Sequence, residues 1–159
     1  MSRITRIEID DSAIAPATPE MEQERRVAIF DLIEDNSFSV PGRDGAPAPD
    51  GPFILDLSIR EGRLVFDMTD EAGAKVAEFH LSLGPFRQVV KDYFQICQSY
   101  FDAVKRLPPA QIEAIDMARR GIHNEGARTL QERLEGKAVL DIDTARRLFT
   151  LICALIPQG

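Results

Sequence analysis

The sequence predicts a single α+β domain over residues 1–159, in which an antiparallel β-meander of about three strands, plus edge strands, is packed by about four helices. Strand-like and helix-like segments are grouped along the chain rather than strictly alternating, which favours this class over a parallel doubly wound sheet. A chain of 159 residues also has the usual length of one domain. Its apolar fraction of 44 % and charged fraction of 28 % are typical of globular proteins and argue against a disordered, fibrous or membrane class.

A short strand, a helix and a loop come first. Alternating β-branched residues predict the strand over residues 3–9. Thr18 is a candidate N-cap for the helix, since Pro19 follows at the first helical position, and the helix should end near Asn36. Residues 40–52 contain four prolines and three glycines, a composition that sustains neither helix nor strand pairing. We therefore expect a surface loop there.

The three strands of the meander follow the loop. Apolar side chains occupy alternate positions in residues 53–60, 64–69 and 75–83, which is the period of a half-buried strand. Glu61 and Gly62 supply a tight turn between the first two strands, because glycine adopts a positive φ at no steric cost. Strands joined by short turns pair antiparallel, so the meander should present one apolar face.

Helices dominate the second half of the chain. The clearest one runs from residue 84 to about residue 106, and its apolar stripe suits it to cover the apolar face of the meander. A short strand is predicted over residues 138–142, followed by a closing helix that Asp143 caps.

Between them, residues 110–135 have the pattern of one helix or of a helix pair. Gly121 and Gly126 leave this open, because a glycine inside a helix costs about 1 kcal/mol relative to alanine. Such positions indicate either a break in the helix or a close approach of another element to the backbone.

Charge is distributed unevenly along the chain. Its net charge is −7, but residues 1–84 hold 8 Lys and Arg against 17 Asp and Glu, whereas residues 85–159 hold 11 against 9. The overall charge argues against non-specific nucleic-acid binding, because it repels a phosphate backbone. A local basic surface in the second half is still compatible with it.

Several classes of protein are excluded by what the sequence lacks. It has no apolar run of the roughly 18 to 20 residues that a membrane span needs, and its first residues carry charges, so we expect a cytoplasmic protein without a membrane partner. Cys97 and Cys153 lie in apolar helical patterns and are expected to be buried thiols. Phosphate-binding glycine loops, paired cysteines and nucleophile elbows are absent from the sequence, and we expect neither a metal nor a cofactor.

The densest polar cluster lies between Asp116 and Arg133. Arginine binds carboxylate or phosphate through two parallel hydrogen bonds, a histidine can move a proton, and an asparagine can orient either partner. The same residues also suit a solvated helix face with ordinary ion pairs of about 0.2–0.5 kcal/mol each. The candidate binding residues, including one from the closing helix, are Arg119, Arg120, His123, Asn124, Arg128 and Arg146.

Two functions follow from this cluster. The first is a binding or regulatory module whose partner is a protein or a small anionic ligand. The alternative is an enzyme acting on a phosphate- or carboxylate-bearing substrate, possibly RNA, with His123 as the candidate catalytic residue. If the arginines and His123 converge in one concave pocket, binding of a small ligand or of an enzyme substrate is favoured. A dispersed arrangement would count against ligand binding and against catalysis.

Long stretches of the sequence resemble a known family. They are IFDLIEDNSF, RLVFDM, LSLGPFRQVVKDYFQIC, IEAIDMARRGIHNEGA and DIDTARRLFTLIC, and they are similar to uncharacterised protein family 0262 of the UPF series, found in alphaproteobacteria. The resemblance covers nearly the whole chain, with residues 40–52 the least similar part. It implies no activity, cofactor or catalytic residue, so functional inferences rest on the residues themselves.

Overall fold

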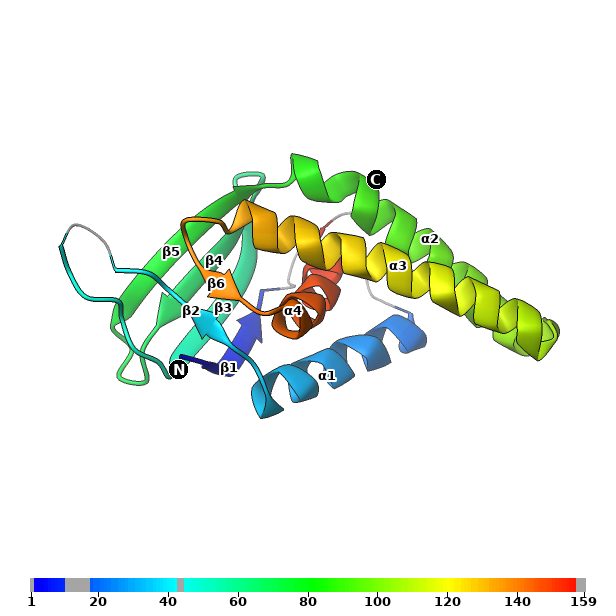
Figure 1. The fold of residues 1–159 in the computed structure, drawn as a ribbon, viewed down its shortest axis with the longest axis horizontal. Coiled ribbons are helices and arrows are strands. Elements are labelled where there is room, and N and C mark those ends of the chain that lie inside the picture. The colour runs from blue at the N-terminus through cyan, green and yellow to red at the C-terminus, as the bar shows by residue number, and fades with distance from the viewer. Residues whose placement is uncertain (1, 11–17, 43–44, 157–159) are drawn as a thin grey trace.

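The computed structural model describes residues 2–10, 18–42 and 45–156 (Figure 1). The helices are α1 (Pro19–Glu34), α2 (Gly84–Arg106), α3 (Pro109–Arg133) and α4 (Ile142–Leu155). The strands are β1 (Ile4–Ile9), β2 (Phe38–Ser39), β3 (Phe53–Arg60), β4 (Arg63–Thr69), β5 (Lys75–Ser82) and β6 (Val139–Leu140). The α+β class is confirmed.

The main sheet has the strand order β1-β3-β4-β5. The meander β3-β4-β5 is antiparallel, with Glu61 and Gly62 at positive φ in its first turn, as the alternating pattern predicts. The edge strand β1 pairs parallel with β3. Parallel neighbours need a crossover of a dozen or more residues, and the chain from β1 to β3 contains α1.

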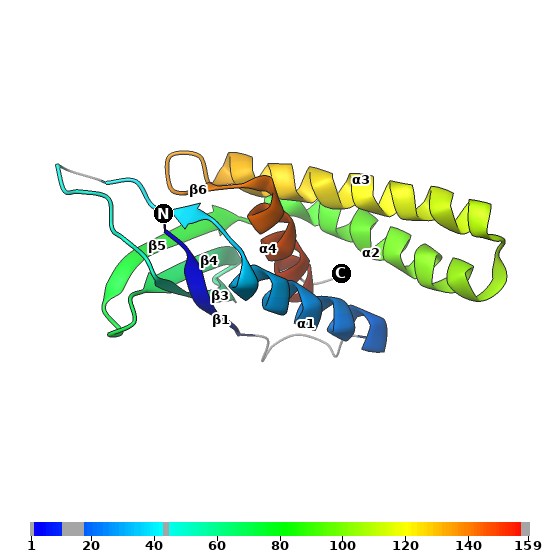
Figure 2. The ribbon, with the colours of Figure 1, turned by 60° about the horizontal axis from the view of Figure 1, so that its bottom comes forward.

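The helix α4 lies at the centre of the fold (Figures 1 and 2). It packs against α1, α3 and β3, and its apolar side chains are almost all buried. The apolar stripe of α2 predicts that helix as the cover of the sheet, but α2 packs chiefly on α3. The two helices form a hairpin that projects away from the sheet (Figure 2).

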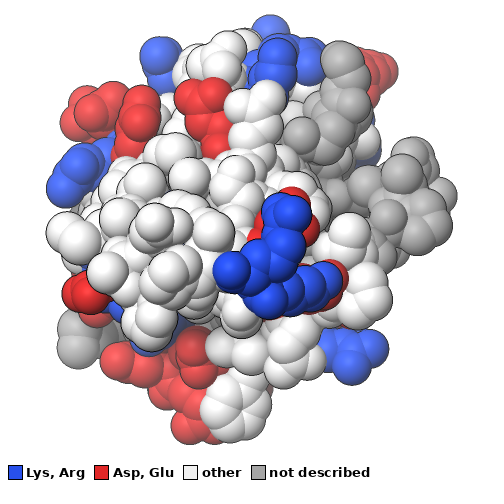
Figure 3. Space-filling model, turned by 90° about the vertical axis from the view of Figure 1, so that its right-hand side faces the viewer, with Lys and Arg blue, Asp and Glu red and all other residues white. Residues whose placement is uncertain are grey.

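The far end of this hairpin is shown in Figure 3. A broad area without charged side chains lies there beside a cluster of basic side chains, and acidic groups lie behind that cluster and toward the edges of the view. Val104 and Leu107 belong to this end of the molecule and are 53 % and 39 % exposed. Among the described helices, none combines the length and apolar character that a membrane crossing requires.

The end of α1 is joined to β1 by Asn36. Its Oδ1 accepts a hydrogen bond from the backbone nitrogen of Ile4 at 2.7 Å, and its Nδ2 donates to the carbonyls of Ile4 and Leu32. Directly after it, β2 pairs antiparallel with β6 in a separate two-stranded sheet. The strand β2 is only two residues long, too short for sequence periodicity to predict.

The structure decides between the alternatives left open for residues 110–135. The helix α3 is continuous over 25 residues, so neither glycine breaks it. Gly126 instead allows a close approach, because a side chain there would collide with the ring of Phe149, whereas Gly121 faces open space.

The predicted cap of α4 is wrong. The cap is Asp141, which accepts a hydrogen bond from the backbone nitrogen of Thr144 at 3.0 Å, and not Asp143.

The remaining N-terminal predictions agree with the structure where it describes them. Thr18 caps α1 by accepting a hydrogen bond from the backbone nitrogen of Met21. Residues 40–42 and 45–52 contain no helix or strand, and positions 43–44 of the predicted loop lie outside the described residues. The prediction for the two cysteines is also confirmed, since Cys97 and Cys153 are buried free thiols.

Candidate functional site

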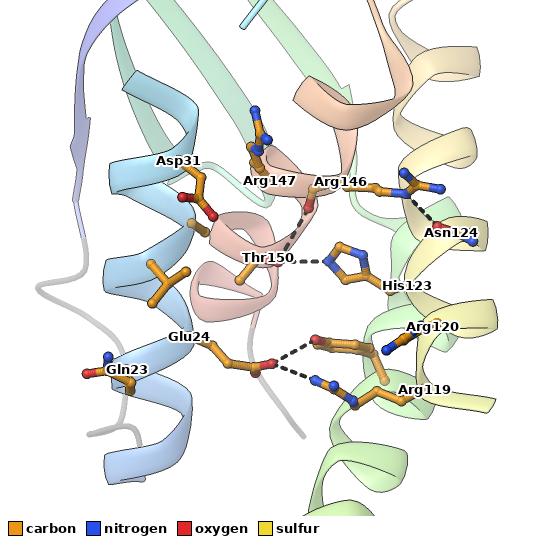
Figure 4. Close-up of a pocket in the computed structure, with 13 residues that line it drawn as sticks. Gln23, Glu24, Asp31, Arg119, Arg120, His123, Asn124, Arg146, Arg147 and Thr150 are labelled. Carbon is orange, nitrogen blue, oxygen red and sulfur yellow. Dashed lines mark hydrogen bonds and ion pairs between the residues drawn. The ribbon is translucent and has the colours of Figure 1, made fainter. Parts of the chain in front are cut away.

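A pocket of about 590 Å³ lies between α1, α3 and α4 (Figure 4). Both α1 and α3 pack on α4, so α4 forms the floor between them, and one side chain of α2 reaches the pocket. Four arginines and two carboxylates contribute its charges. The lining residues are Gln23, Glu24, Val27, Ala28, Asp31, Tyr93, Arg119, Arg120, His123, Asn124, Arg146, Arg147 and Thr150.

Helical spacing brings these side chains to the pocket. On α1, residues Glu24, Val27 and Asp31 are three or four positions apart and therefore share one face. On α3, the pairs Arg119–His123 and Arg120–Asn124 are each four apart and share the opposing face.

Glu24 bridges the pocket at one end. Its Oε1 accepts hydrogen bonds from Nη1 of Arg119 at 3.1 Å and from the hydroxyl of Tyr93 at 3.3 Å (Figure 4). Burial raises the pKa of the Glu24 carboxyl, and the charge of Arg119 and both hydrogen bonds oppose that rise. Its Oε2 is buried and has no hydrogen-bond partner within the described part of the chain. The carboxylate therefore ties α1 to α2 and α3.

Arg119 is held by three side chains of the protein, those of Glu24, Asp116 and Tyr100. Besides Glu24, its guanidinium donates to Oδ1 of Asp116 from Nε at 3.1 Å and from Nη2 at 2.6 Å. The same group lies over the ring of Tyr100, with its Cζ 4.5 Å from the ring centroid. Three of its five N–H donors and one face of the guanidinium are thus occupied, and Arg119 holds the helices together.

His123 extends from α3 toward α4, the floor of the pocket. Its Nε2 lies 2.8 Å from Oγ1 of Thr150, and its ring packs against the rings of Tyr93 and Phe149. Burial, together with the charges of Arg146 and Arg119, lowers the pKa of His123 from 6.5 to about 4. At neutral pH the imidazole is therefore uncharged.

The hydroxyl of Thr150 also lies 3.3 Å from the backbone carbonyl of Arg146. A hydroxyl has one proton. It therefore donates either to that carbonyl, while Nε2–H of His123 donates to Thr150, or to Nε2 itself.

The three other arginines of the pocket have more N–H donors left that can face a ligand. Arg146 donates from Nε to Oδ1 of Asn124 at 2.6 Å and from Nη1 to Asp143 at 2.7 Å. Arg147 donates from Nη1 to the backbone carbonyl of Asp35. Arg120 pairs with Asp116 at 3.0 Å, and its side chain is 74 % exposed. Since a guanidinium has five N–H donors, these contacts leave N–H groups of each arginine for a ligand.

Most of the sequence-predicted binding residues lie around this pocket. Arg119, Arg120, His123, Asn124 and Arg146 all line it, whereas Arg128 is exposed on α3 and does not. Sequence analysis missed the wall formed by α1 together with Tyr93 and Thr150. Their side chains are brought to the cluster only by packing on α4, and no local pattern in the sequence could have found them.

The described residues hold no group of three or more His, Cys, Asp or Glu side chains placed to bind a metal ion. A second hollow, of about 400 Å³, lies on the sheet and is bordered by acidic side chains of β1, β3 and β4. The polar groups of the first pocket are guanidinium, carboxylate, amide, imidazole and hydroxyl groups.

Comparisons with known proteins give one family. The model of "Uncharacterised protein family (UPF0262)" matches residues 1–158. A UPF0262 protein of Paracoccus denitrificans is 78 % identical over 156 residues, covering 98 % of this chain and 96 % of the relative. UPF0262 proteins of Roseobacter denitrificans and Dinoroseobacter shibae are 72 % and 74 % identical, each covering 98 % of both chains. No solved structure matches.

Proposed function

We propose that this chain, which belongs to the uncharacterised protein family UPF0262, is a binding protein that takes a small anionic ligand into the pocket between α1, α3 and α4. The ligand would carry a phosphate or carboxylate group. The observation that supports this most strongly is the convergence of Arg120, Arg146 and Arg147 from two helices on one concave site.

The charge balance within the pocket supports an anion. Of the two lining carboxylates, Glu24 is neutralised by Arg119, so three further arginines face the single carboxylate of Asp31. Asp116 and Asp143 pair with Arg120 and Arg146 outside the pocket lining. Exposed pairs of this kind are worth only about 0–1 kcal/mol, so a ligand anion can compete for their guanidinium groups.

The size of the pocket supports a small molecule rather than an extended partner. Its volume of about 590 Å³ falls within the roughly 300–1,000 Å³ that is usual for small-molecule sites. We also place the protein in the cytoplasm, a location supported by its two free buried thiols, since disulfides are rare in that compartment.

Catalysis at this site is the alternative function, and the state of His123 makes it the weaker one. General acid–base catalysis is most efficient when the pKa of the catalytic group lies near the working pH. The pKa of His123 is lowered to about 4, which makes the neutral imidazole a weak base and a hydrogen-bonding group at neutral pH. An enzyme that used it as a base would have a rate profile that changes near pH 4.

Replacing Arg120 by alanine should weaken ligand binding while leaving the fold intact, because this side chain is exposed and makes one surface ion pair. Thermal-shift and calorimetric titration with inorganic phosphate, nucleotides, sugar phosphates, dicarboxylates and short RNAs would identify a ligand, since binding stabilises the folded state. Loss of a hydrogen bond to a charged group costs about 1.5–3 kcal/mol, or a factor of about 10–100 in Kd.

Arg128→Ala is the matched control for that experiment. Arg128 is exposed on the same helix but lies outside the pocket, so its loss should leave the Kd within about twofold. The proposal fails if no probe stabilises the protein at millimolar concentration, or if the two variants lose affinity equally. Stabilisation by the RNAs alone would redirect it to nucleic acid.

A further inference from the structure

We propose that the ligand is amphipathic: its anionic group binds the arginines of α3 and α4, and an apolar body joined to that group packs on Val27 of α1. This deepens the function proposed above and rests on it. Two observations indicate that the ligand also has an apolar part. The two walls of the pocket differ in charge and polarity, and the volume between them exceeds that of a single anionic group.

The two walls differ in charge. The arginines of the pocket lie on α3 and α4, and its carboxylates, Glu24 and Asp31, lie on α1 (Figure 4). Asp31 makes no ion pair or side-chain hydrogen bond with any described residue, so its charge acts directly on a ligand. An anionic group is thus attracted to one wall and repelled by the other, which orients the ligand across the pocket.

Val27 lies between those two carboxylates on α1. It is 47 % exposed, and Phe30, three residues later on the adjoining side of the helix, is 65 % exposed. The core-facing side of α1 is formed instead by Ala28 and Leu32, which are buried. This helix therefore has a second apolar surface that borders the arginine pocket and that folding itself leaves in contact with water.

The volume of the pocket also leaves room for more than an anionic group. A cavity of about 590 Å³ belongs to the size class that encloses a drug-sized molecule, most of it against apolar surface with a few polar groups that set its orientation. A phosphate or carboxylate at the arginines leaves the side toward Val27 unfilled. An uncharged aromatic or aliphatic body fills it without burying another charge.

Matched pairs of ligands test this inference in the full-length protein. Methyl phosphate is compared with phenyl phosphate, and acetate with phenylacetate, by calorimetric titration at one ionic strength. Each pair shares its anionic group and differs mainly in the apolar body. In the pair whose anion binds, the phenyl compound should bind about tenfold more tightly, which corresponds to partial burial of one ring.

Val27→Thr should remove much of this preference. Threonine has the shape of valine but carries a hydroxyl in place of a methyl group, so the phenyl compound should lose about threefold or more in affinity while the methyl compound is unchanged. Val104→Thr is the control, because Val104 is equally an exposed helical valine, 53 % accessible, and lies outside the pocket.

The possible outcomes separate this inference from the proposed function. If methyl and phenyl compounds bind equally and binding depends on Arg120, the anion site stands and the apolar body is overturned. Equal losses in Val27→Thr and Val104→Thr overturn the contact with α1. If none of the four compounds binds while an anion without an apolar body does so through Arg120, the amphipathic ligand is also overturned. The proposed function itself is removed if no anion binds, or if Arg120→Ala and Arg128→Ala lose affinity equally.

Discussion

Replacing Gly126 by alanine should lower the free energy of unfolding by about 1–2 kcal/mol. A Cβ at this position of α3 would lie less than 3.0 Å from three atoms of the Phe149 ring. That ring is fully buried and packs on the rings of Tyr93 and His123, so it cannot move aside freely. Overpacking of this kind costs about 1–3 kcal/mol and sometimes more, and the gain in helix propensity of about 1 kcal/mol offsets only part of it.

Gly121→Ala is the matched control in the same helix. No atom lies within 4 Å of a Cβ built there, so the variant should be more stable than the parent by up to about 1 kcal/mol. Urea unfolding at neutral pH measures both changes. Phe149→Leu shortens the opposing side chain, and the double variant with Gly126→Ala should be more stable than the two single changes predict. If both glycine variants unfold at the same urea concentration, Gly126 is not in close contact.

His123→Gln should flatten the dependence of stability on pH between about pH 6.5 and pH 4. The pKa of His123 is lowered from 6.5 to about 4 in the folded protein. As the pH falls through this range, the unfolded state takes up a proton that the folded state does not, so stability present above pH 6.5 is progressively lost. The loss approaches about 3 kcal/mol by pH 4, from about 1.4 kcal/mol per pKa unit.

Glutamine can keep a neutral hydrogen bond to Thr150 but cannot take up that proton. Urea unfolding of both proteins should be measured from pH 4 to 7.5. The difference between their free energies of unfolding should become smaller as the pH falls. Glu24 does not produce the same loss of stability at low pH. Its raised pKa contributes stability that is present below pH 4.5 and is lost as the pH rises.

His80→Gln is the control for this measurement, because it removes the other histidine from the exposed surface of β5. It should keep the loss of stability seen in the parent protein. If His123→Gln loses as much stability as the parent between pH 6.5 and pH 4, the imidazole is not buried in its neutral form.

Much of the fold could be predicted because its signals are local. Alternation places the meander, Gly62 marks its first turn, and Thr18 with Pro19 marks the start of α1. Local signals do not predict strands whose partners are distant in the sequence, or strands of only two residues. The parallel neighbour of β1 is some fifty residues away in the sequence, and β2 is too short to show a period.

The continuity of α3 shows how tertiary contacts override propensity. Gly126 weakens the helix locally, yet the missing side chain lets Phe149 of α4 approach the backbone. That contact sets the face of α3 that turns toward α4, and with it the side chains that enter the pocket. Arg120 lies on that side and Arg128 does not, although both belong to the same basic cluster in the sequence.

The sequence by itself determined the class of the fold, most of its elements and the cluster around His123, because periodicity, capping and local charge density act over a few residues. Only the tertiary structure decided that α1 supplies the opposite wall, that Arg119 is bound to Glu24, and that burial keeps His123 neutral. These features depend on distances between side chains far apart in the chain, such as those of Glu24 and Arg119, which are 95 positions apart. Helix packing sets such distances, and no sequence pattern records them.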